Sequence, residues 1–282
     1  TPTLENQPGK KRTKPSVGFP ATLHLMEDLP FWTTFFHDLN IPLFTSEGFK
    51  DSLKTGKKIA GAEFCAPIDS MYGHVAYLAE KCEYVFMPVY LESRIKPNRT
   101  ERYFCYYTQF SASLAFLEGV RDTQKLVSPM VNFTKSNEHN VKLLLGSLKQ
   151  MGFDTFSASK VSMALKKAHA QTVKLKRDFE LLYENRSIPE GDVSVVMLGR
   201  PYVVLSETLN KGIPDIFTRM GVTAWYQDML KVDENHDVAL DRLLKKIPWH
   251  FAANIIRAAE LICRTREVYP VFITAFKCAP DS

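Results

Sequence analysis

The chain has 282 residues, of which 45% are hydrophobic and 24% are charged, so we expect a soluble globular protein with one large core or two smaller ones. No apolar run reaches the roughly 18–20 residues that a membrane-spanning helix needs, and the net charge of +5 is accompanied by no nucleic-acid-binding motif. We therefore expect neither a membrane nor a nucleic-acid partner, and the positive charge weakly favours an acidic surface or an anionic ligand.

Residues 1–15 are polar and basic and contain no apolar segment of a secretory signal. We interpret them as a disordered lead-in or an interdomain linker. The five cysteines are odd in number and widely spaced, which indicates a reducing compartment, here the cytoplasm, rather than a disulfide framework. The sequence has no Cys-x-x-Cys and no His-Glu-x-x-His, so a compact zinc site is not expected.

From residue 16 to 156, short apolar runs typical of buried strands alternate with helical patterns that have one apolar face. The expected elements are an apolar run at 16–20, a helix from Leu29 to Leu39, a strand at 41–45, a helix from Ser46 to Thr55, a helix at 67–81, a strand at 84–90, a helix at about 109–118, a strand at 125–133 and a helix at 141–151. This alternation predicts a parallel sheet covered by helices.

The second half begins with a long amphipathic helix, at 157–184, that contains no helix breaker. After it come a buried strand at 193–198, a helix at 213–220, a strand at 222–226, a helix at 247–264 and a last strand that runs to Cys278. We predict an α/β fold of two Rossmann-like parallel-sheet lobes, 16–156 and 191–282, joined by the long helix of 157–190. A three-stranded lobe without a closing helix leaves apolar surface uncovered, so we expect the second lobe to be truncated.

Three cysteines lie where ligands usually bind in such folds. Cys65 and Cys105 each precede a helical pattern, and Cys278 ends the last strand. Strand ends and the loops after them form the binding sites of open α/β sheets, so the three thiols can converge. Convergent thiolates suit a soft metal or an iron–sulfur cluster, although buried cysteines that act as small hydrophobic residues are the alternative.

Two further residues are candidates for the same site, each with an ordinary alternative. His74, on the helix after Cys65, either bonds to a cluster sulfur or makes local contacts only. Arg200, in the loop after the strand at 193–198, either contacts an anion such as a CoA phosphate or stabilises that loop. The basic residues of the long helix predict a solvated face, with docking of an acidic partner as the alternative. Cys82 and Cys263 are interpreted as packing residues.

Four groups of residues occur in order over nearly the whole chain: Val17-Gly-Phe-Pro-Ala with Pro30-Phe-Trp-Thr-Thr-Phe-Phe, Glu63-Phe-Cys-Ala-Pro with Gly73-His-Val, Leu198-Gly-Arg-Pro-Tyr with Leu209-Asn-Lys-Gly-Ile-Pro, and Phe276-Lys-Cys-Ala-Pro-Asp. Together they resemble the 2-hydroxyacyl-CoA dehydratase and double-cubane-cluster superfamily, in particular the branch fused to actin-like ATPase activase modules. The family's cluster cysteines map onto Cys65, Cys105 and Cys278.

The resemblance implies an oxygen-sensitive protein that holds an iron–sulfur cluster of the 4Fe–4S or double-cubane type. An ATP-dependent activase module, in the same chain or a separate one, would deliver low-potential electrons to it. In related dehydratases such an electron removes water from a 2-hydroxyacyl-CoA through a ketyl radical, and in the double-cubane branch it reduces small molecules. We thus expect an iron–sulfur domain of such a system, with an acyl-CoA as substrate and a dimer as one assembly. The alternatives are a non-catalytic docking module of an activase fusion protein and a CoA-ester or anion-binding protein.

Overall fold

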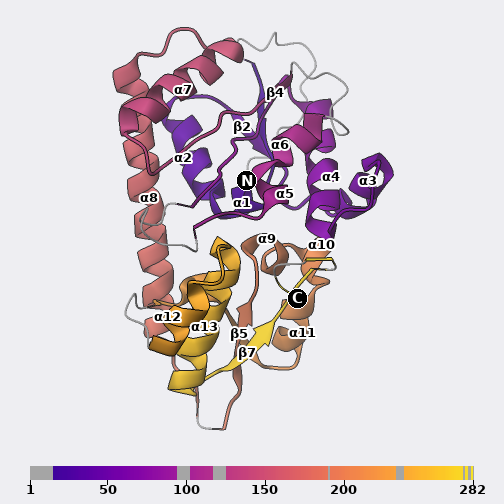
Figure 1. Ribbon diagram of the computed structural model, residues 1–282, viewed down its shortest axis with the longest axis vertical. Helices are drawn as coiled ribbons and strands as arrows, with labels where there is room; N and C mark the ends of the chain where they lie inside the picture. The colour runs from indigo at the N-terminus through magenta and orange to yellow at the C-terminus, as the bar shows by residue number, and fades with distance from the viewer. Residues whose placement is uncertain are drawn as a thin grey trace.

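The protein contains two parallel sheets, one in each half of the chain (Figure 1). The computed structural model describes residues 15–93, 102–116, 125–189, 191–232, 238–275, 277–278 and 281. Within these residues the strand order is β2-β1-β3-β4 in the first sheet and β6-β5-β7 in the second, and all pairs are parallel. The predicted α/β fold with two Rossmann-like lobes is confirmed. The predicted basic lead-in lies outside the described residues, apart from Pro15.

The first lobe is built around a central strand, β1 (Val17–Phe19), that lies between β2 (Leu43–Thr45) and β3 (Tyr84–Phe86). The short strand β4 (Leu126–Val127) extends the sheet beyond β3. The helices of this lobe are α1 (His24–Glu27), α2 (Leu29–Asp38), α3 (Ser52–Ile59), α4 (Ala66–Lys81), α5 (Tyr106–Gln109), α6 (Ser111–Leu114) and α7 (Asn137–Gln150).

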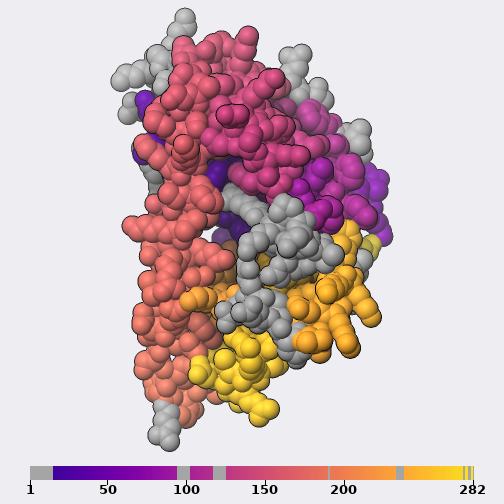
Figure 2. All heavy atoms as spheres, turned by 60° about the vertical axis from the view of Figure 1, so that its left-hand side comes forward, coloured from indigo at the N-terminus to yellow at the C-terminus, as the bar shows by residue number. Residues whose placement is uncertain are grey.

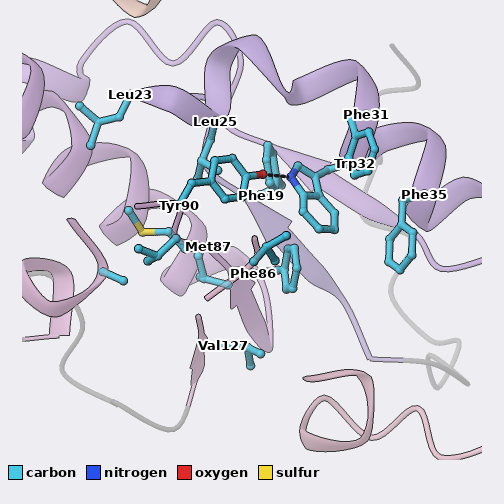
Figure 3. Packing of buried hydrophobic residues seen from close by; sticks show 14 of the residues in the cluster. Phe19, Leu23, Leu25, Phe31, Trp32, Phe35, Phe86, Met87, Tyr90 and Val127 are labelled. Atoms are coloured by element: carbon cyan, nitrogen blue, oxygen red, sulfur yellow. Dashed lines mark hydrogen bonds between the residues drawn. The ribbon is translucent and has the colours of Figure 1, made fainter. Parts of the chain in front are cut away.

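The core of the first lobe is rich in aromatic side chains, several of them from α2 (Figure 3). Phe31, Trp32 and Phe35 lie on one face of this helix because they are one, three and four positions apart, and all three are buried. Trp32 Nε1 donates a hydrogen bond of 2.6 Å to the hydroxyl of Tyr90, which satisfies the indole group inside the core. This packing fixes the first sheet and the loops that follow its strands.

Helices α3 and α4 approach each other so closely that two glycines are required at their contact. A Cβ atom at Gly56 would overlap the carbonyl oxygen of Asp69, and one at Gly73 would overlap the carbonyl oxygen of Ser52. The Ser70 hydroxyl donates to Ser52 Oγ at 2.9 Å in the same contact. The two helices are joined by the segment that carries Cys65, so this contact positions that cysteine.

The long helix α8 (Ala158–Glu184) runs beside both lobes, as Figures 1 and 2 show. It begins at Ser157, whose hydroxyl accepts a hydrogen bond of 3.2 Å from the Lys160 backbone N–H. Its basic side chains, Lys166, Lys167, Lys174, Lys176 and Arg177, are exposed, which confirms the predicted solvated face. Among the described residues, no helix combines the length and the apolar composition that a bilayer crossing requires.

The second lobe is built around β5 (Ser194–Leu198), which lies between β6 (Thr223–Tyr226) and β7 (Tyr269–Phe272). Every residue of β5 is buried: Val195 and Met197 join the core that extends into the first lobe, and Val196 and Leu198 join a second cluster on the other face. The other elements are α9 (Pro201–Val204), α10 (Glu207–Asn210), α11 (Ile213–Arg219), the 3₁₀-helix η3 (Gln227–Met229), α12 (Val238–Leu244) and α13 (His250–Thr265). The truncation of this lobe and the domain boundaries stay predictions.

Several predicted element limits were wrong. The helix expected from Ser46 begins at Ser52, because the Ser46 hydroxyl accepts a hydrogen bond of 2.9 Å from the Ala21 N–H rather than capping a helix. The strands expected at 84–90 and 125–133 are shorter, since Pro88 and Pro129 have no N–H for the ladder. The helix after Cys105 begins at Tyr106 and is divided at Phe110, while residues 117 and 118 lie outside the described residues.

Candidate functional site

Each of the three predicted cysteines lies at the end of a secondary-structure element. Cys65 and Cys105 immediately precede α4 and α5 and have almost the same extended backbone, with φ/ψ of −71°/150° and −61°/155°. Cys278 lies in the loop after β7, where its N–H donates to the carbonyl oxygen of Ala275 at 3.1 Å. The helix N-terminus after Cys65 favours a negatively charged sulfur, because its backbone N–H groups and dipole point towards it.

Contacts between neighbouring residues bring the three cysteine segments together. Lys277, next to Cys278, forms an ion pair of 2.5 Å with Glu63. Phe64, next to Cys65, makes an edge contact with Tyr107, with 5.6 Å between the ring centroids. Segments that are far apart in the sequence therefore meet at the two residues that precede Cys65.

The segment of Cys105 is also held to the second lobe. Tyr103 N–H donates to the carbonyl oxygen of Pro248 at 3.0 Å, and its own carbonyl oxygen accepts from the His250 N–H at 2.8 Å. The Phe104 ring packs against Phe251 of α13, with 5.3 Å between centroids. Cys105 thus lies where the two lobes meet.

The thiols influence one another electrostatically. Burial raises the pKa of Cys65, and the charge of Cys105 raises it further while Arg200 opposes the shift. Burial raises the pKa of Cys278 to about 12, Arg200 again opposes the shift, and Asp281 and Cys65 add to it. The structure therefore places Cys65, Cys105 and Cys278 in one neighbourhood, with Arg200 as the cation that acts on two of them. We call these three cysteines together with Arg200 and Tyr202 the three-thiol site.

Arg200 is held by a carboxylate from the end of the chain. Its Nε donates to the two carboxylate oxygens of Asp281 at 2.9 and 2.8 Å, and its Nη2 donates to Oδ1 at 2.7 Å. Both side chains are only 1% exposed. Burial alone lowers the pKa of Arg200, but Tyr202 and Asp281 reverse this and raise it above its ordinary value. The guanidinium is thus a permanent buried charge, and its contacts match the loop-stabilising alternative rather than contact with an anion from solvent.

Tyr202 completes the site. Its hydroxyl oxygen accepts a hydrogen bond of 3.1 Å from Arg200 Nη1, and its ring packs edge-on against Phe251, 5.6 Å between centroids. Burial raises the pKa of Tyr202, Arg200 opposes the shift, and the charges of Cys105 and Cys278 raise it again. The phenol is therefore protonated at neutral pH and lies close to two of the thiols.

The site lies at the carboxyl ends of adjacent parallel strands. Arg200 follows β5 and Cys278 follows β7, and the chain passes from β6 on one side of β5 to β7 on the other, which makes this a topological switch point. Gly199 permits the close approach of the two loops: its φ is 153°, and a Cβ there would overlap the carbonyl oxygen of Ile273.

The described residues offer no site for a single metal ion. Among the described residues there is no group of three or more His, Cys, Asp or Glu side chains that could hold one metal ion. Ligands of a single zinc ion must all lie about 2.3 Å from it, whereas a cluster binds each thiolate to a different iron atom and needs a wider spacing. The three cysteines carry the donor atom that such clusters require, and cluster binding itself stays a prediction.

His74 lies away from the thiols along α4. It is nine residues after Cys65, which corresponds to about 13 Å of helix. Its Nδ1 is hydrogen-bonded to Ser46 Oγ at 2.8 Å, and burial lowers its pKa to about 4. These are the contacts of a buried histidine of the first lobe, and its interaction with a cluster sulfur stays a prediction.

His24 is the second buried histidine of this lobe. Its Nε2 must donate to the carbonyl oxygen of Pro88, at 3.1 Å, because a carbonyl only accepts. This bond joins the start of α1 to the loop after β3, and burial lowers the pKa of His24 to about 4.

We expect the protein to lose stability as the pH falls from about 6.5 to about 4. The unfolded chain binds protons at His24 and His74 in this range and the folded chain does not, so each histidine should cost about 2 kcal/mol at pH 5 relative to pH 8. Denaturant unfolding at several pH values measures the loss. His24→Gln and His74→Gln should each reduce it, and an unchanged profile in both variants would show that these histidines are not the cause.

The remaining cysteines differ from each other. Cys82 is buried, and its Sγ lies 3.2 Å from the position that a Cβ on Gly18 would take, as expected of a packing residue. The prediction for Cys263 was wrong, because this thiol is exposed on α13. None of the five cysteines, all of which the structure describes, forms a disulfide.

Sequence reasoning missed Asp281 and treated Tyr202 as a local structural residue. Asp281 stands three residues after Cys278 and Arg200 one residue after Gly199, both beyond the carboxyl ends of predicted parallel strands. Because such ends meet at one edge of a sheet, opposite charges at these places were the available signal.

A family model described as CoA enzyme activase uncharacterised domain matches residues 16–230. The chain belongs to this family. The matched range contains Cys65, Cys105, Arg200 and Tyr202, whereas Cys278 and Asp281 lie beyond it. The family agrees with the resemblance noted in the sequence at the level of a domain associated with a CoA enzyme activase.

The other comparisons add little to the family. No curated protein matches the chain. Among solved structures, a periplasmic sugar-binding protein from Pseudomonas fluorescens is similar over 91% of this chain and 67% of its own, with 14% sequence identity and a TM-score of 0.22.

Proposed function

We propose that this chain is the iron–sulfur domain of an activase-associated CoA-ester enzyme, with Cys65, Cys105 and Cys278 as the cluster ligands. The observation that carries the proposal is that three thiols from distant segments are close enough for Cys105 to raise the pKa of Cys65 and for Cys65 to raise the pKa of Cys278. Membership of the activase-associated family supports a role in an activase-associated CoA-ester enzyme.

Different residues of the chain would have different roles at such a site. The three thiolates would bind iron, since thiolate sulfur is its preferred ligand in sulfide clusters. Thr108 Oγ1, hydrogen-bonded to Cys105 Sγ at 3.1 Å, orients that sulfur. Arg200 offsets part of the negative charge that three thiolates bring together, and burial of Cys278 and Arg200 keeps water from that side.

When bound, a 4Fe–4S or double-cubane cluster supplies low-potential electron transfer, here from an ATP-dependent activase module to an acyl-CoA. A reducing, cytoplasmic setting belongs to this proposal, because thiols stay available to iron only where disulfides do not form. A dimer that pairs two such domains is compatible with it.

Serine substitution tests the ligands. Protein purified and reconstituted without oxygen should contain about four irons per chain. Cys65→Ser, Cys105→Ser and Cys278→Ser should each remove most of the iron, since a hydroxyl is a poor ligand for this metal. The matched controls are Cys82→Ser and Cys263→Ser, which should keep the wild-type iron content and visible absorbance.

The substitutions also separate this proposal from a docking module without chemistry. If the triple serine variant still folds and supports electron delivery by the activase at the wild-type rate, the cysteines are packing residues and the redox role is wrong. Tight binding of a CoA ester by iron-free protein would favour a plain CoA-ester-binding role instead.

A further inference from the structure

Tyr202 has a hydrogen to donate at the three-thiol site. The residue is 3% exposed, and its hydroxyl oxygen already accepts from Arg200 Nη1. In the part of the chain that the structure describes, no side chain or carbonyl accepts the hydroxyl hydrogen. A buried donor without an acceptor costs about 1–3 kcal/mol, so this arrangement calls for an acceptor outside the described residues.

Arg200 and Asp281 set the direction of the Tyr202 hydroxyl group. Asp281 accepts three hydrogen bonds from Arg200, and Arg200 Nη1 donates to the hydroxyl oxygen of Tyr202. The hydroxyl hydrogen of Tyr202 must therefore point away from the guanidinium. The ring itself is fixed by its edge contact with Phe251. Cys105 and Cys278 are near enough for their charges to act on the phenol.

We propose that Tyr202 donates a hydrogen bond to a sulfur of the iron–sulfur group held by Cys65, Cys105 and Cys278, with Arg200 and Asp281 as positioning residues. This inference rests on the proposed function and assigns a new residue to the site. A hydrogen bond to sulfur stabilises the reduced, more negative state more than the oxidised one, so Tyr202 raises the reduction potential.

The variant Tyr202→Phe isolates the hydroxyl, because phenylalanine keeps the ring and its packing against Phe251. In reconstituted full-chain protein we expect unchanged iron content and a midpoint potential that is more negative than in the wild type. The matched control is Tyr183→Phe, since Tyr183 is a buried tyrosine of α8 whose pKa responds to burial, Arg186 and Glu267 rather than to the cysteines. That variant should keep the wild-type potential.

A second measurement does not depend on the potential. Pulsed electron paramagnetic resonance of the reduced wild type should show coupling to a proton that exchanges in deuterated water, and Tyr202→Phe should lose it. An unchanged potential together with an unchanged proton coupling overturns the role of Tyr202 and leaves the proposed function standing. Wild-type protein that takes up no iron overturns both.

Discussion

Replacing Asp281 by alanine is expected to lower the free energy of unfolding by about 3–5 kcal/mol. The substitution leaves the Arg200 guanidinium, 1% exposed, without its carboxylate, and an unpaired buried charge is among the costliest defects in a protein. The loop that carries Cys278 should loosen at the same time, because the Asp281 side chain that ties it to Arg200 is lost. Denaturant unfolding and iron content after reconstitution measure the two effects.

The double variant Arg200→Met with Asp281→Ala is the control for this explanation. It removes both charges, and replacement of a whole buried ion pair by apolar groups is often neutral, so most of the lost stability should return. Iron binding should not return to the same extent, since Arg200 would no longer offset the thiolates. If the double variant is as unstable as Asp281→Ala alone, the cost does not come from the unpaired guanidinium.

Replacing Gly73 by alanine should lower the free energy of unfolding by about 3 kcal/mol or more. The added methyl group would overlap the backbone carbonyl of Ser52, and backbone cannot move aside as a flexible side chain does, so α3 would have to separate from α4. The segment between these helices carries Glu63 and Cys65, so the variant should also lose the Lys277–Glu63 contact and bind less iron.

The chain offers a matched control in Gly146, which is exposed in the middle of α7 and has no atom within 4 Å of an added Cβ. Gly146→Ala should stabilise the protein by about 0.5–1 kcal/mol, because alanine has less conformational freedom to lose than glycine. Equal stability changes in both variants would mean that helix propensity, and not the α3–α4 contact, decides the outcome.

The sequence was sufficient for the architecture because its strongest patterns are local. The unbroken apolar periodicity of 157–184 predicted α8, and the continuous apolar run at 193–198 predicted β5 as a strand buried on both faces. The strands are shorter than predicted because prolines such as Pro88 lack the N–H that a sheet requires. These prolines are visible in the sequence, but the prediction gave them too little importance.

The site was predicted only in part. The positions of Cys65 and Cys105 before helices followed from local patterns, but the partnership of Arg200 with Asp281 joins residues that are 81 positions apart. The role of Tyr202 depends on that partnership and could not be derived without it. The same holds for the contact of Gly56 and Gly73, since a close approach of two helices leaves no signal in either helix alone.

The electron paramagnetic resonance spectrum of the reduced, anaerobically reconstituted wild type, recorded with iron and sulfide counted on the same sample, tests the three-thiol site most directly. We predict the signal of a reduced iron–sulfur cluster, with iron and sulfide present in equal amounts and about four of each per chain. A folded, colourless protein that gives no such signal and retains no iron would contradict the assignment of Cys65, Cys105 and Cys278 as cluster ligands.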